Sequence, residues 1–185
     1  AGPNCENVVI RGKGTIASGG RELAEKIIAD EQEHLKDYLA EHAALVAECE
    51  NERTIPGRVR PRLINMSNCR NVWVHGLTLK NGASWNQHMI YSDNITTDHC
   101  RFVSEGVWNG DGWDPDSSTN CTLFACEFAT GGDAVAIKSG KNPEGNKIGR
   151  PSAHIYVFDC RSTAGHGICL GSEMSGGIED VQIWD

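Results

Sequence analysis

The 185-residue sequence has few aromatic residues, no long hydrophobic run and no cluster of lysine and arginine. No apolar stretch is long enough to span a bilayer, and no signal peptide stands at Ala1, so we expect neither a membrane protein nor a membrane contact. The formal net charge of −8 argues against a nucleic-acid-binding protein. An anionic substrate is still compatible with this composition, because a few local cations are enough to hold it.

The cysteines lack the spacing of a metal site. Eight are present, none forms a C-x-x-C pair, and the closest two, Cys121 and Cys126, are five positions apart. We expect them to be unpaired core residues, which fits a reducing compartment slightly better but leaves both a cytoplasmic and a secreted protein open. The chain begins and ends within strand-like residues, so we expect a fragment, and its lack of a targeting segment says little about the compartment.

A strand-like unit repeats along most of the chain. Equivalent positions, separated by 23, 26, 34 and 26 residues, are Asn71, Asn94, Asn120, His154 and Asp180. After each, apolar or β-branched residues alternate with other residues, which is the period of a strand. Short strands in units of this size, separated by glycine-rich turns, predict an all-β chain folded as a right-handed parallel β-helix. Three cysteines six positions past these starts, Cys100, Cys126 and Cys160, should then form an internal ladder.

One segment departs from this repeat. Arg21 to Glu50 is rich in alanine, leucine, glutamate and lysine, and its apolar residues recur at helical spacing. We therefore predict one truncated β-helix domain over residues 1–185, with a helical insertion at 21–50. The insertion should cap the solenoid or form one wall of a cleft, and a cap is the default expectation.

Three polar clusters recur at matched places in successive units. Asp111 lies in NGDGWD, Asp133 in GGDAVAIKSG and His166 in GHG, each just before the third strand-like run of its unit. Since neighbouring coils stack about 4.8 Å apart, these side chains should share one site. Aspartate and glycine also make ordinary turns, but recurrence in three coils favours a site. Two carboxyl groups are the requirement for glycoside hydrolysis.

These clusters resemble motifs of glycoside hydrolase family 28, the polygalacturonases. NGDGWDPDSS is similar to the family's N-x-D-G-x-D-x-D motif, GGDAVAIKSG to G-D-D-x-x-A-I-K-S-G, and GHGICLGSE to G-H-G-x-x-x-G-S-E. The resemblance covers about Asn4 to Asp185 except the helical segment. It implies hydrolysis of α-1,4-galacturonide bonds in an acidic polysaccharide such as pectin, with inversion and without a metal or other cofactor. The GSEMSGG run looks most like exo-acting bacterial members.

The resemblance also implies residue roles. Asp111 and Asp133 match the pair that activates water, and His166 matches the histidine that orients the site. Asn109 is expected to hold Asp111, and Lys138 to lie near the substrate. Further substrate contacts are expected from His88, Trp113 and Asp114.

Two departures from the family pattern leave alternatives open. The family's middle aspartate, usually the general acid, falls on Gly132, with Asp114 or Asp116 as possible replacements. The family's R-x-K motif, which grips the uronate carboxylate, should lie beyond Asp185. A catalytically impaired uronate-binding β-helix is therefore the second hypothesis. A pectate lyase is the third, disfavoured because the sequence has no dense acidic cluster for Ca²⁺.

Overall fold

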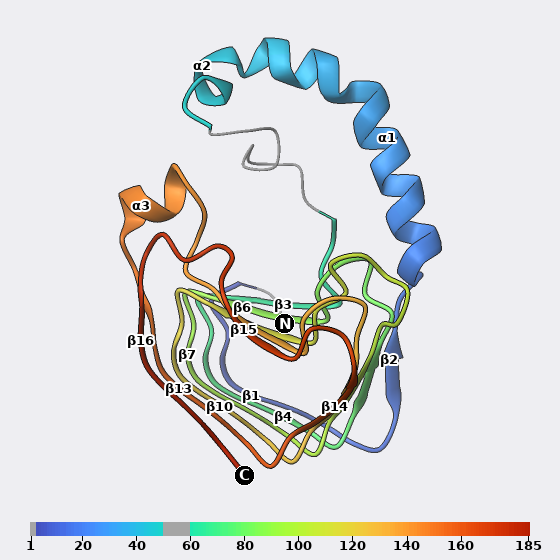
Figure 1. The fold of residues 1–185 in the computed structure, drawn as a ribbon, viewed down its shortest axis with the longest axis vertical. Coiled ribbons are helices and arrows are strands. Elements are labelled where there is room, and N and C mark those ends of the chain that lie inside the picture. The colour runs from blue at the N-terminus through green and yellow to red at the C-terminus, as the bar shows by residue number, and fades with distance from the viewer. Residues whose placement is uncertain (1–2, 50–59) are drawn as a thin grey trace.

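The computed structural model describes residues 3–49 and 60–185, which form a right-handed parallel β-helix, as predicted (Figure 1). Each complete coil contributes one strand to each of three parallel sheets. The first sheet contains, in spatial order, β1 (Glu6–Arg11), β4 (Arg70–His75), β7 (Asp93–Asp98), β10 (Thr119–Phe124), β13 (Ser152–Phe158) and β16 (Ile178–Trp184). The second contains β14 (Arg161–Ala164), β11 (Glu127–Ala129), β8 (Arg101–Val103), β5 (Thr78–Lys80) and β2 (Thr15–Ala17). The third contains β15 (Ile168–Leu170), β12 (Val135–Ile137), β9 (Trp113–Asp116), β6 (Gln87–Ile90) and β3 (Ile64–Ser67).

The register of the first sheet matches the repeat in the sequence. Val72 pairs with Ile95, Ile95 with Cys121, Cys121 with Ile155, and Ile155 with Val181. Ile95, Cys121 and Ile155 are fully buried, so each coil adds one apolar layer to a continuous core. The predicted equivalence of the units is confirmed.

Asparagine begins several coils for a conformational reason. Asn71, Asn94 and Asn120 all have φ near 55°, in the left-handed region, which asparagine tolerates better than most residues. Their side chains also connect successive coils: Asn94 Nδ2 donates to Asn71 Oδ1 at 2.8 Å, and Asn71 Nδ2 to Asn7 Oδ1 at 3.0 Å. The repeated asparagine thus serves both the turn and the stacking.

None of the eight cysteines, all of which lie in the described part of the chain, forms a disulfide. Cys100 and Cys126 are buried at equivalent positions of adjacent coils, and the Cys100 backbone N–H lies 3.4 Å from Cys126 Sγ. Cys160 continues this ladder and is half-buried. As predicted, these cysteines serve as core residues.

Helices interrupt the coils at two places. α1 (Gly20–Glu41) and α2 (Ala43–Val46) follow β2, and α3 (Glu144–Ile148) lies between β12 and β13. In Figure 1, α1 extends well away from the coils, and within it only Gly20 and Ala24 are buried. Arg21 lies over the Trp108 ring at 5.0 Å. Within residues 3–49 and 60–185, no helix is both long and apolar enough to cross a membrane.

Candidate active site

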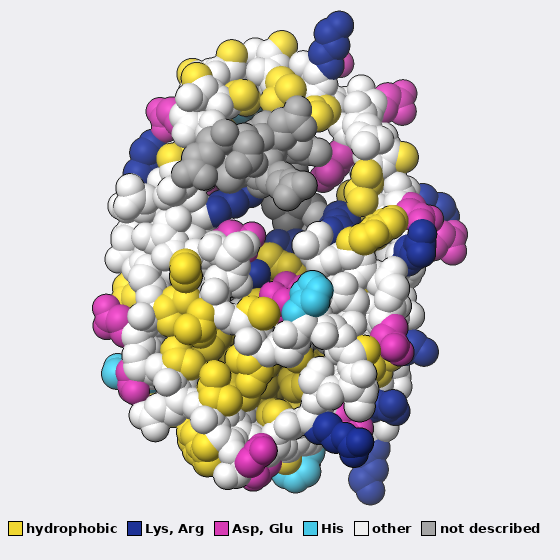
Figure 2. All heavy atoms as spheres, viewed as in Figure 1, with side chains coloured by type: hydrophobic (Ala, Val, Ile, Leu, Met, Phe, Trp, Pro, Cys, Tyr) yellow, Lys and Arg dark blue, Asp and Glu magenta, His cyan; other side chains and the backbone are white. Residues whose placement is uncertain are grey.

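The structure brings Asp111, Asp133 and His166 together. They precede β9, β12 and β15, three neighbouring strands of the third sheet. The Asp133 backbone N–H donates to Asp111 Oδ1 at 3.1 Å, and His166 Nδ1 lies 3.0 Å from Asp133 Oδ1. Backbone bonds align the same loops, since the Gly112 N–H donates to the Asp133 carbonyl at 2.9 Å. Figure 2 shows acidic and basic side chains around a hollow near the centre of this face.

The two aspartates lie in different environments. The side chain of Asp111 is 7% exposed, that of Asp133 19%, and that of His166 75%. Burial raises the pKa of Asp111, although the Lys138 ammonium and the Asp133 N–H act in the opposite direction. A carboxyl group with a raised pKa can carry a proton, whereas a carboxylate paired with an exposed imidazole is suited to accept one.

Lys138 supplies a buried positive charge beside these carboxyl groups. Its Nζ lies 3.0 Å from Glu173 Oε2, 3.8 Å from Asp111 Oδ2 and 4.6 Å from the Trp85 ring centroid. Burial lowers the pKa of Lys138, but the nearby carboxyl groups of Asp114 and Glu173 outweigh it, and the net pKa is raised. Lys138 therefore remains positively charged at the site.

Two arginines that the sequence reasoning did not assign to the site lie next to it. Arg62 Cζ is 3.8 Å from the Trp85 ring centroid. Arg60 donates to the carbonyls of Ala83 at 2.8 Å and Trp108 at 2.9 Å. Arg-Pro-Arg was a usable signal, because residues two apart in extended chain point to the same side.

Asn86 forms direct hydrogen bonds with the backbone of Asp111. The side-chain Nδ2 and the backbone N–H of Asn86 both donate to the Asp111 carbonyl, at 3.0 and 2.8 Å. Asn109 Oδ1 instead accepts from Arg60, at 2.5 Å. The role expected of Asn109 toward Asp111 stays a prediction.

Trp113 and Asp114, for which substrate contacts are predicted, have fully buried side chains. All four residues of β9 are buried, so strand alternation exposes neither face. The Trp113 indole donates to Thr97 Oγ1 at 3.2 Å inside the core. Within the described residues, neither carboxyl oxygen of Asp114 has a hydrogen-bond partner. Burial raises its pKa well above the usual value, and Asp111 adds to this.

His88, also predicted as a substrate contact, is largely buried. It is 7% exposed, with Nδ1 2.7 Å from Asn65 Oδ1 and Nε2 3.3 Å from Asp116 Oδ2. Burial lowers its pKa despite the neighbouring Asp116. Because both ring nitrogens have partners within the protein, the geometry gives His88 a structural role.

Gly132 leaves space that Asp111 fills. A Cβ atom built on Gly132 would lie 2.0 Å from Asp111 Oδ1. The Asp111 carboxyl group thus occupies the position where a side chain at residue 132 would begin. The observed orientation of the Asp111 carboxyl group therefore depends on the absence of a side chain at residue 132.

The structure is thus a stack of parallel coils that carries two carboxyl groups and an imidazole before adjacent strands of one sheet. The model of glycosyl hydrolases family 28 matches residues 1–185. The chain therefore belongs to glycosyl hydrolase family 28.

Individual relatives agree with this membership. The chain is 39% identical over 129 residues to a probable polygalacturonase of Vitis vinifera, covering 68% of this chain and 26% of that protein. It is 27% identical over 192 residues to the exo-poly-alpha-D-galacturonosidase of Dickeya chrysanthemi, covering 95% and 32%. The crystal structure of a hyperthermoactive exopolygalacturonase from Thermotoga maritima superposes with a TM-score of 0.79 at 34% identity, covering 98% of this chain and 44% of that one. The chain thus spans between a quarter and a half of the length of these relatives.

Proposed function

We propose that the protein containing this chain hydrolyses α-1,4-galacturonide bonds in polygalacturonate, with inversion. The proposal rests on the contacts of Asp133. Its backbone N–H donates to Asp111, and its carboxylate lies beside the imidazole of His166. Relatives described as polygalacturonases and exopolygalacturonases support the choice of substrate. The two carboxyl groups would act on opposite sides of the scissile bond.

The environments of the two carboxyl groups suggest which does what. Asp111, whose pKa is raised by burial, would protonate the glycosidic oxygen as its bond to the anomeric carbon breaks. Asp133 would accept a proton from the water that attacks the anomeric carbon. His166, 3.0 Å from Asp133, would hold that carboxylate in position. The cycle leaves Asp111 ionised and Asp133 protonated, and proton exchange with solvent restores both.

The cations beside the carboxyl groups support a uronate substrate. Lys138 and Arg62 both lie against Trp85, whose ring would offer an apolar surface to a pyranose. A guanidinium is well suited to a carboxylate, because it can donate two parallel hydrogen bonds. We therefore assign Arg62 as the residue that binds a galacturonate carboxylate.

The test uses the full-length protein with polygalacturonate, following new reducing ends over time. Asp133→Asn should lower kcat by about 10²–10⁴. The matched control is Asp30→Asn, in α1. The side chain of Asp30 is 76% exposed, so this variant should leave kcat unchanged. A folded wild-type protein that releases no reducing ends would reject the proposal.

The second candidate is a uronate-binding β-helix without turnover. Gly132 favours it, because the position that resembles the family's general acid has no side chain. Calorimetric titration with an oligogalacturonate separates the two candidates. Binding with no product, even at high protein concentration, would support the binding module.

A further inference from the structure

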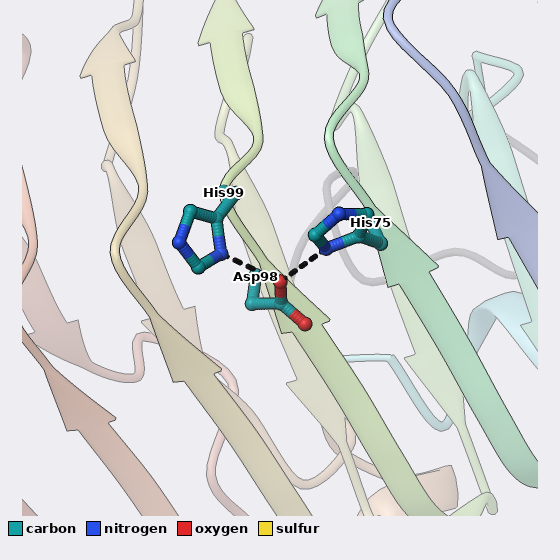
Figure 3. A group of neighbouring side chains, drawn as sticks. All are labelled: His75, Asp98 and His99. Carbon is teal, nitrogen blue, oxygen red and sulfur yellow. Dashed lines mark hydrogen bonds and ion pairs between the residues drawn. The ribbon is translucent and has the colours of Figure 1, made fainter.

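We propose that His75, Asp98 and His99 form a binding site for a divalent transition-metal ion, and that zinc fits it (Figure 3). His75 Nδ1 lies 2.5 Å and His99 Nδ1 2.7 Å from the same atom, Asp98 Oδ1. The three candidate ligand atoms lie within 4.8 Å of one another. Figure 3 shows the two imidazoles on either side of the carboxylate.

The fold explains why three donors meet here. His75 in β4 and Asp98 in β7 are paired residues of adjacent strands, so their side chains stand together on the outer face of the first sheet. The next residue of a regular strand would point to the opposite face. His99 instead has φ of 51°, in the turn that also places Gly76 and Ala125 at positive φ. This turn brings the side chains of consecutive residues, Asp98 and His99, to the same side.

The surroundings hold the carboxylate and leave the histidines accessible. The Trp73 indole donates to Asp98 Oδ2 at 2.6 Å, which leaves Oδ1 directed at the two imidazoles. Burial raises the pKa of Asp98, but hydrogen bonds from Trp73, His99 and His75 outweigh it, and the net pKa is lowered. The Asp98 side chain is 6% exposed, against 38% for His75 and 60% for His99. An outer partner that orients a metal-binding carboxylate is a common feature of metal sites.

The donor chemistry matches zinc. Two imidazoles and a carboxylate, with a position left for water, are a known zinc ligand set, with metal–ligand distances of about 2.0–2.2 Å. Tetrahedral ligands are then about 3.3 Å apart, so each Nδ1 must move less than about 1 Å away from Asp98 Oδ1. Each Nδ1 must be free of its proton, which moves to Nε2 or to solvent.

A bound ion would connect β4 and β7, and therefore two consecutive coils, on a different sheet from Asp111, Asp133 and His166. It would act as a structural cross-link. The proposal is independent of the proposed hydrolysis, which needs no ion at this place.

Zinc binding to the full-length protein, stripped with EDTA and then freed of it, tests the site. Isothermal titration should detect binding that His99→Asn weakens by at least about tenfold, since a first ligand is lost. Asparagine keeps the left-handed backbone at residue 99. His75→Gln provides a second variant at a strand position. His154→Asn is the matched control, because His154 has φ of 57° on the same sheet and its Nδ1 lies 2.7 Å from Asp180 Oδ2, away from the proposed site.

Cobalt separates this site from the cysteines. Co²⁺ bound to imidazole and carboxylate lacks the intense sulfur-to-metal charge-transfer absorption of thiolate sites. We expect the Co²⁺-bound protein to lack that absorption. The spectrum of bound Co²⁺ should disappear in His99→Asn and persist in His154→Asn. The proposal is overturned if the wild-type protein binds no zinc. It is also overturned if folded His99→Asn and His75→Gln bind zinc as tightly as wild type, because the binding is then adventitious.

Discussion

The variants Gly132→Asp and Gly132→Asn have side chains of the same shape, and only the first has a carboxyl group. Comparing their activities tests whether residue 132 marks the position of a proton donor. The new Cβ would lie 2.0 Å from Asp111 Oδ1, so that oxygen must retreat by about 1.4 Å to reach an ordinary contact. It is the end of a flexible side chain, and its retreat breaks the hydrogen bond from the Asp133 N–H. This costs about 1.5–3 kcal/mol, equally in both variants.

The rate ratio of the two variants therefore isolates the proton donor. We expect Gly132→Asp to exceed Gly132→Asn in kcat by about 10²–10⁴, the usual worth of general-acid catalysis. This equals about 3–5 kcal/mol of transition-state stabilisation. In both variants residue 132 displaces the carboxyl group of Asp111, the donor proposed for wild type, so only the aspartate variant keeps a carboxylic acid beside the leaving oxygen.

The assay is the initial rate of reducing-end formation from polygalacturonate at saturating substrate, with folding of each variant checked by circular dichroism. Equal kcat values for the aspartate and asparagine variants would show that residue 132 does not face the leaving oxygen. In that case both the alignment of Gly132 and its assigned role are incorrect.

Three further predictions, the first paired with a comparison variant of opposite sign, concern stability and substrate affinity. Asp114→Asn should raise Tm relative to wild type by an amount that grows with pH, because a raised pKa gives stability that is lost as pH rises through the folded-state value. Asp93→Asn should instead lower Tm relative to wild type at neutral pH, because hydrogen bonds lower the pKa of Asp93. Arg62→Gln should raise KM for polygalacturonate by about tenfold or more, and much less for methyl-esterified pectin. Phe102→Ala should lower the free energy of unfolding by about 3–5 kcal/mol in urea titrations, because Phe102 is fully buried and stacked on Phe128 at 4.8 Å.

Each of these has a contrary outcome. A Tm difference for Asp114→Asn that does not change with pH would mean that the folded and unfolded carboxyl groups titrate alike. Equal KM changes on both pectins would remove Arg62 from carboxylate recognition. A cost below about 1 kcal/mol for Phe102→Ala would mean that the coils repack around the lost ring.

The sequence by itself determined the repeat and its register. Alternating apolar residues and asparagines at the coil starts report local requirements, namely a strand period and a left-handed backbone, that each stretch of chain must meet alone. The same register was sufficient to align Asp111, Asp133 and His166 before three adjacent strands.

Only the tertiary structure decided what surrounds those residues. Alternation predicts one buried and one exposed face, yet Trp113 and Asp114 are both buried, since other segments cover the outer face of β9 as well. The position of Arg62 over Trp85 and the turn of Asp111 toward Gly132 likewise depend on contacts between distant segments. Side-chain packing across coils fills whatever space the neighbours leave, and that space is not encoded in the periodicity of any one strand.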